Sequence, residues 1–76
     1  MPEEEIEVKL LAKSINEFLK AQPEEARNLF VGRYYFLDSL RDVARYCGMS
    51  ESKAKSILFR TRRSLKTHLE EEGFIV

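Results

Sequence analysis

Residues 39–66 constrain the fold of this chain more than any other segment. Their sequence reads SLRDVARYCGMSESKAKSILFRTRRSLK. Apolar residues first recur with the spacing of a short helix, then Gly48 permits a sharp turn and Ser50 can cap a second helix. That second helix has six Lys or Arg residues and no acid between Glu51 and Glu70. Two helices joined by a tight glycine turn, the second being basic, are typical of a DNA-reading helix-turn-helix.

The charge of the chain is zero overall but strongly segregated. Thirteen basic residues balance thirteen acidic ones. Residues 1–26 carry a net charge of −4, residues 27–69 carry +7, and residues 70–72 carry −3. Because a partner responds to the nearest face rather than to the sum, the basic block over residues 39–66 favours an anionic partner such as DNA over a merely solvated face.

Length and composition predict one small, all-α domain. The chain has 76 residues, three glycines and two prolines, and it lacks the alternating β-branched runs of strands. No apolar run approaches the roughly 20 residues that cross a bilayer, and the N-terminus is acidic where a signal peptide is basic, so we expect a cytoplasmic location and no membrane partner. One histidine, one cysteine and no phosphate-binding glycine loop predict neither an enzyme nor a bound cofactor or metal.

Four helices are expected, of which the first two precede the helix-turn-helix. The first runs from about residue 5 to residue 20. Its apolar stripe consists of Val8, Leu11, Ile15, Phe18 and Leu19, with Ile6 and Leu10 beside it. Pro23 ends this helix and opens the next, which is expected to reach about residue 35. The residues that it is expected to bury are Ala26, Leu29, Phe30 and Tyr34.

The last two helices have clear start and stop signals. Ser39 is the expected N-cap of the third helix, and Asp42 completes a capping-box-like pair with it. Ser50 caps the fourth helix, which should run to about residue 72 before Gly73 stops it. The apolar side of the fourth helix is expected to consist of Ala54, Ile57, Leu58, Thr61, Leu65 and Leu69.

Three other side chains have mainly structural interpretations. Cys47 lies on the apolar stripe of the third helix and is expected to be a small core residue. Arg33 is expected to pair with an acid on the buried side of its helix. His68 flanks the apolar side of the fourth helix and receives no functional assignment.

Several motifs from Pro23 onward occur together in one known family. They are the Pro-Glu-Glu start at residue 23, the Arg-Tyr-Tyr-Phe that ends at residue 36, the Asp-Val-Ala of residues 42–44, the Gly-Met-Ser of residues 48–50, and KSILFRTR at residues 55–62. Together they resemble region 4 of the sigma-70 family of bacterial RNA polymerase sigma factors, closest to the extracytoplasmic-function group. The last motif is similar to the family's recognition helix almost residue for residue. The resemblance covers about residues 14–72.

The resemblance implies that the fourth helix reads the −35 element of a promoter. It places Lys55, Ser56, Phe59 and Arg60 at base edges. Their chemistry agrees, because Lys and Arg donate to guanine O6 and N7 and an aromatic ring contacts thymine methyl groups. Ser52 is a further candidate base contact through its hydroxyl. The candidate phosphate contacts, which set register without reading sequence, are Ser39, Arg41, Lys53, Arg62, Arg63 and Lys66.

The resemblance also implies protein partners. Sigma region 4 docks on the flap of the RNA polymerase β subunit, and anti-sigma factors bind its surface. The candidate docking residues are Phe18, Leu19, Phe30 and Phe36. The alternative for each of them is an ordinary place in the core.

Departures from the family pattern leave other interpretations open. Ala54 stands where the family usually has valine, and Lys53 replaces a common threonine. The upstream region that grips the core enzyme and melts the promoter is absent, which implies a C-terminal fragment or a free-standing relative. We divide the chain into a lead-in (residues 1–13), the region 4-like domain (14–72) and a tail (73–76). The alternatives are the output domain of a response-regulator-type transcription factor and an interaction-only module.

Overall fold

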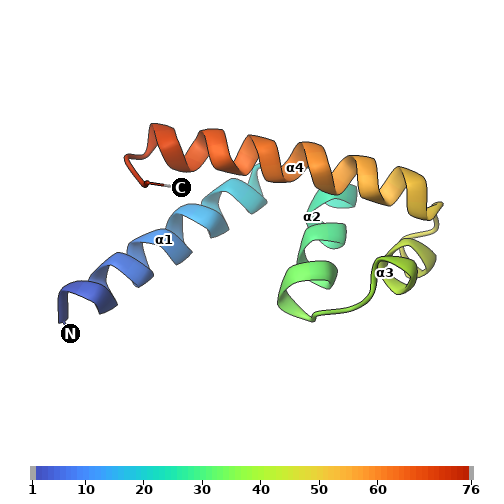
Figure 1. The fold of residues 1–76 in the computed structure, drawn as a ribbon, viewed down its shortest axis with the longest axis horizontal. Helices are drawn as coiled ribbons and strands as arrows, with labels where there is room; N and C mark the ends of the chain where they lie inside the picture. The colour runs from blue at the N-terminus through green and yellow to red at the C-terminus, as the bar shows by residue number, and fades with distance from the viewer. Residues whose placement is uncertain (1, 76) are drawn as a thin grey trace.

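The computed structural model describes residues 2–75, whose regular structure is entirely helical. The elements in chain order are α1 (Pro2–Lys20), α2 (Glu24–Phe30), the π-helical segment η1 (Val31–Tyr35), α3 (Leu40–Tyr46) and α4 (Glu51–Glu71). The long helix α4 lies along the top of Figure 1, with α1 below its C-terminal half and extending beyond its end, and with α2 and α3 below its other half. The expected all-α fold of four helices with a long C-terminal helix is therefore confirmed.

Serine side chains start α3 and α4 as expected. The hydroxyl oxygen of Ser39 accepts a hydrogen bond from the backbone N–H of Asp42 at 3.1 Å, and that of Ser50 accepts one from Lys53 at 3.1 Å. The reciprocal half of the capping box does not form. The carboxylate of Asp42 instead lies 3.1 Å from the guanidinium of Arg45, one turn further along α3.

Glycine ends both helices by the same backbone motif. Gly48 has φ of 72° and Gly73 has φ of 90°, in the left-handed region that side chains disfavour. After α3, the N–H of Met49 bonds to the carbonyl of Ala44 at 2.9 Å. After α4, the N–H of Phe74 bonds to the carbonyl of Leu69 at the same distance, 2.9 Å. These are the reversed bonds of a Schellman motif, and both expected helix ends are confirmed.

The core lies between α4 and the three helices below it. Leu29 and Val43 are fully buried, and Ala44 and Ala54 are small buried residues where α3 meets α4. The other buried apolar residues of this cluster are Phe18, Leu19, Ala26, Phe30, Ile57 and Leu58. The predicted inner side of α4 is confirmed, with Leu65 partly buried. Cys47 also packs against this core as expected, and it is partly buried.

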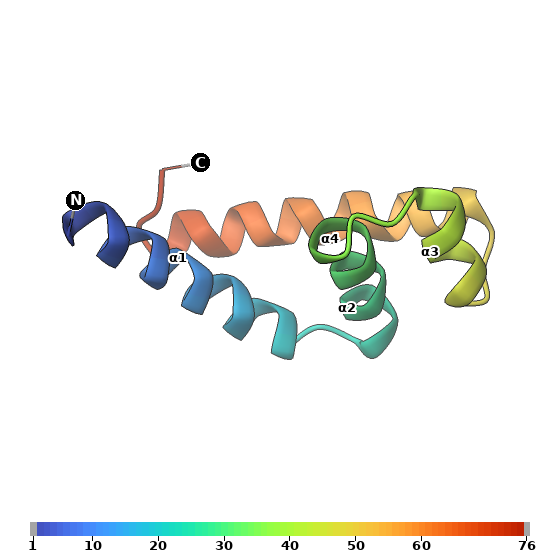
Figure 2. The ribbon, with the colours of Figure 1, turned by 90° about the horizontal axis from the view of Figure 1, so that it is seen from below.

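The first half of α1 corrects the sequence prediction. The helix begins at Pro2 rather than near residue 5, and its apolar stripe is not buried along its whole length. The side chains of Ile6, Val8 and Leu10 are 57%, 65% and 53% exposed. The two perpendicular views show that α1 crosses α4 obliquely rather than lying parallel to it (Figures 1 and 2). Only the second half of α1 therefore contributes to the core.

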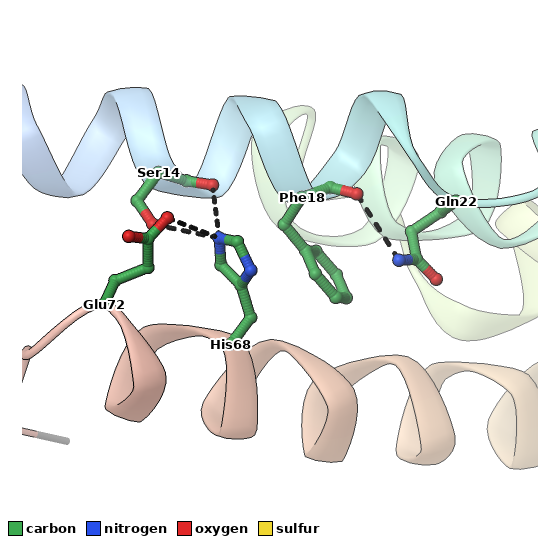
Figure 3. Close-up of polar contacts among 5 residues, drawn as sticks. All are labelled: Ser14, Phe18, Gln22, His68 and Glu72. Atoms are coloured by element: carbon green, nitrogen blue, oxygen red, sulfur yellow. Dashed lines mark hydrogen bonds and ion pairs between the residues drawn. The ribbon is translucent and has the colours of Figure 1, made fainter.

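His68 fastens α1 to α4 where the two helices meet. Its Nε2 lies 3.0 Å from the hydroxyl oxygen of Ser14, 3.2 Å from the carbonyl oxygen of Ser14 and 3.6 Å from the carboxylate of Glu72 (Figure 3). The imidazole also packs on the ring of Phe18, with centroids 5.5 Å apart. No sequence pattern indicates this role, because the partners lie 54 positions apart in the chain.

The helix that follows Pro23 reaches Tyr35 as expected but changes character on the way. Its α-helical hydrogen bonding ends at Phe30, and η1 continues with a wider turn in which the N–H of Phe36 bonds to the carbonyl of Val31 at 3.1 Å. The expected burial of Tyr34 is wrong, since its side chain is 36% exposed. No helix within residues 2–75 is long and apolar enough to cross a membrane.

Candidate nucleic-acid interface

The side of α4 opposite the core presents a continuous row of exposed side chains. Residues three, four or seven positions apart share one face of a helix. This row, which we call the outward face, consists of Ser52, Lys55, Ser56, Phe59, Arg63 and Lys66. It contains three cations and one aromatic ring but no acid. The structure thus brings together on one face most of the residues predicted from the sequence to contact DNA.

A shallow open depression marks the middle of this face. It is lined by Lys55, Ser56, Phe59, Arg60 and Arg62. Phe59 is 51% exposed, and the guanidinium of Arg63 lies 5.8 Å from the centre of its ring. A half-exposed aromatic ring beside cations offers an apolar contact surface within a positive field.

The remaining predicted contacts lie at the flanks of α4 or on α3. The ammonium of Lys53 is 3.7 Å from the carboxylate of Glu25 on α2, in an ion pair about half exposed on each side. Arg60 reaches the same flank, where it also lines a groove with Pro23 and Glu25. Ser39 and Arg41 are exposed at the start of α3, and no hydrogen bond or ion pair within residues 2–75 joins them to the α4 residues.

Arg62 is already held by a tyrosine. Its Nη1 donates a hydrogen bond to the hydroxyl oxygen of Tyr34 at 2.6 Å. Tyr34 belongs to η1, 28 positions earlier in the chain. The sequence did not predict this contact, because its two partners lie 28 positions apart in the chain.

Three of the four candidate docking residues are core residues. Phe18, Leu19 and Phe30 are only 5–6% exposed, so they are not available to a protein partner in this fold. The alternative interpretation of these three residues, an ordinary place in the core, is therefore correct. Phe36 is 71% exposed and follows η1 on the surface.

The predicted partner of Arg33 is corrected by the structure. Its guanidinium donates to the backbone carbonyl of Asp38 at 3.2 Å rather than to a carboxylate. The carboxylate of Asp38 instead accepts a hydrogen bond from the hydroxyl of Tyr46 at 2.9 Å. The Tyr46 hydroxyl lies in the space that a side chain on Gly32 would occupy. Asp38 and Gly32 thereby join α3 to η1.

The pKa values of two titratable groups at the end of α3, Tyr46 and Cys47, are raised. Partial burial of its hydroxyl and the hydrogen bond to Asp38 raise the pKa of Tyr46. Burial, with a smaller contribution from Glu25, raises the pKa of the Cys47 thiol, which keeps it protonated and weakly nucleophilic at neutral pH. No group of three or more potential metal-ligating His, Cys, Asp or Glu residues occurs within the described part of the chain.

Asp38→Asn is expected to lower the pKa of Tyr46 toward its ordinary value of 10.0, because the amide is a neutral acceptor. Because the pKa of Tyr46 is higher in the folded state than in the unfolded state, its protonated hydroxyl stabilises the fold. This stabilisation is fully present below pH 10.0 and is lost as the pH rises through the folded-state pKa. Absorbance titration of the phenols, with Tyr46→Phe to identify the signal, measures the shift. Asp42→Asn is the control, since Asp42 has the weakest effect on this group. Equal shifts in both variants would contradict the Asp38 contact.

The comparisons with known proteins give no match. No family model matches the chain, and neither a curated protein nor a solved structure does.

Proposed function

We propose that this chain is the promoter-reading domain of a bacterial sigma factor, equivalent to region 4, and that α4 recognises a −35 element. The outward face of α4 is the observation that carries the proposal. It is exposed along the helix, cationic, free of acids and backed by a packed α3, which is the arrangement that a helix-turn-helix needs to place a helix in DNA. The resemblance of residues 14–72 supports the choice of family.

The dimensions and chemistry of α4 suit the major groove. Twenty-one residues give a helix about 31 Å long, and the groove is wide enough to admit a helix. Lys55 and Arg60 supply donors for guanine, and Phe59 supplies an apolar surface for thymine methyl groups. Arg41, Arg62, Arg63 and Lys66 supply charge for phosphates, and Lys53 does so once it leaves Glu25.

DNA binding is expected to weaken steeply with salt. Neutralising about five phosphates gives a plot of log K against log salt with a slope of about −4 to −5. Fluorescence anisotropy of a labelled duplex over a series of salt concentrations measures this slope. A single-stranded oligonucleotide of the same sequence is the control. A slope near zero would contradict the assignment of these cations to phosphates.

Selection from a random duplex library tests the proposed specificity. We expect recovery of a −35-like motif whose bases respond to changes at Lys55 and Arg60. Recovery of a symmetric site, together with a dimer in light scattering, would favour the response-regulator alternative instead.

Docking on RNA polymerase is proposed as a second property of the same domain. Its support is the exposed apolar pair Phe36 and Leu37, which are 71% and 78% exposed and follow η1 rather than lying on α4. An anti-sigma factor is a candidate for the same surface. Capture of the polymerase core by this domain, lost in Phe36→Ala, tests the proposal, while capture without any promoter binding would favour the interaction-only alternative.

A further inference from the structure

Tyr34 and Arg62 form a polar pair at one flank of the outward face. The hydroxyl oxygen of Tyr34 accepts from Arg62, and a phenol has one O–H donor in addition to its acceptor sites. The donor of Tyr34 is therefore still available, as are the other N–H groups of the guanidinium. A phenol O–H and a cationic guanidinium that lie side by side both suit the same kind of ligand atom, an anionic oxygen.

The ring of Tyr34 is fixed from two sides. It packs on Phe30, with centroids 4.8 Å apart at a tilt of 54°, and Phe30 is buried at 6% exposure. The guanidinium of Arg33 lies 6.0 Å from the centre of the Tyr34 ring. Arg33 is in turn held by the carbonyl of Asp38. A hydroxyl on a ring that is already held in place loses less conformational entropy on binding a ligand than a hydroxyl on a mobile side chain.

The wider turn of η1 gives its two tyrosines different partners. Tyr34 reaches Arg62 on α4, whereas the hydroxyl of its neighbour Tyr35 donates to Asn16 on α1 at 3.5 Å. π-Helical turns are frequently found at functional sites. Here the turn brings one tyrosine to the cationic helix.

We propose that Tyr34 and Arg62 together bind one phosphate of the DNA backbone, with Tyr34 both positioning Arg62 and donating its own O–H to a phosphate oxygen. The inference rests on the proposed DNA-binding function and assigns a residue of η1 to that interface. Arginine contributes the charge, and the fixed phenol orients its planar fork toward a tetrahedral anion. A contact of this kind sets the register of α4 without reading sequence.

Tyr34→Phe tests the pair without changing the charge of the protein. We expect affinity for any duplex to fall about 3- to 10-fold. Arg62→Ala is expected to reduce the magnitude of the salt slope by about 0.9, and the slope of Tyr34→Phe should fall toward that of Arg62→Ala. The double variant should bind more weakly than Arg62→Ala alone, but by less than the sum of the two single losses, because part of the effect of Tyr34 acts through Arg62. Tyr35→Phe is the matched control and should bind like the unchanged protein.

The outcomes separate this inference from the proposed function. If Lys66→Ala weakens DNA binding but Tyr34→Phe behaves like Tyr35→Phe, the inference is wrong and the DNA-binding function stands. If the unchanged protein binds no duplex, both are wrong. Without DNA, the Arg62 side-chain N–H resonances in NMR should exchange faster with water in Tyr34→Phe than in Tyr35→Phe, and equal rates would overturn the positioning role.

Discussion

Leu29→Ala is expected to lower the free energy of unfolding by about 3 kcal/mol, which is within the range for a leucine deleted from a packed core. Leu29 is fully buried, at 0% exposure, in the core cluster that joins α2, α3 and α4. Small domains have a total stability of only about 5 kcal/mol or little more, so the substitution removes a large share of that stability. Urea denaturation followed by circular dichroism measures the loss.

Leu10→Ala is the matched control for this prediction. It removes the same atoms from a side chain that is 53% exposed on α1, so its expected effect is within about 0.5 kcal/mol. A loss equal to that of Leu29→Ala would show that the first half of α1 is buried in solution, contrary to the fold described above.

Arg60→Ala is expected to lower affinity for the selected promoter duplex about 5- to 150-fold, which corresponds to about 1–3 kcal/mol for a bidentate contact with guanine. Affinity for an unrelated duplex should change much less, because the lost contact carries sequence information. Competition binding with both duplexes measures the two effects in one experiment.

Lys66→Ala separates a base contact from a phosphate contact. Lys66 is exposed on the same helix, and its loss should weaken binding to both duplexes alike and reduce the salt slope by about one. If Arg60→Ala and Lys66→Ala reduce affinity equally on every sequence, the division of α4 into base and phosphate contacts is wrong.

Local signals made much of the fold predictable from the sequence. Ser39 and Ser50 cap their helices, and Gly48 and Gly73 end theirs, because these interactions involve neighbours in the chain. The two sides of α4 were likewise predictable, since a strong 3.6-residue period fixes which residues face the core. The grouping of Lys55, Ser56 and Phe59 on one exposed face follows from that period.

Features that depend on how helices cross were not predictable. The apolar residues of α1 continue toward its start, but the oblique crossing with α4 leaves Ile6 and Val8 exposed. The ring of His68 meets Ser14 only after both helices have packed. The hydrogen bond between Tyr34 and Arg62 similarly involves the π-helical segment η1, which no residue pattern predicts.

The attachment of α1 determines on which side of the domain any fused polypeptide would lie. α1 meets α4 through Ser14, Phe18 and His68, on the inner side of α4, and its first residues point away below that helix in Figure 1. The outward face is on the opposite side. A tag, label or second protein joined ahead of Pro2 would therefore be tethered away from the row of cations, and the oblique helix would act as a spacer.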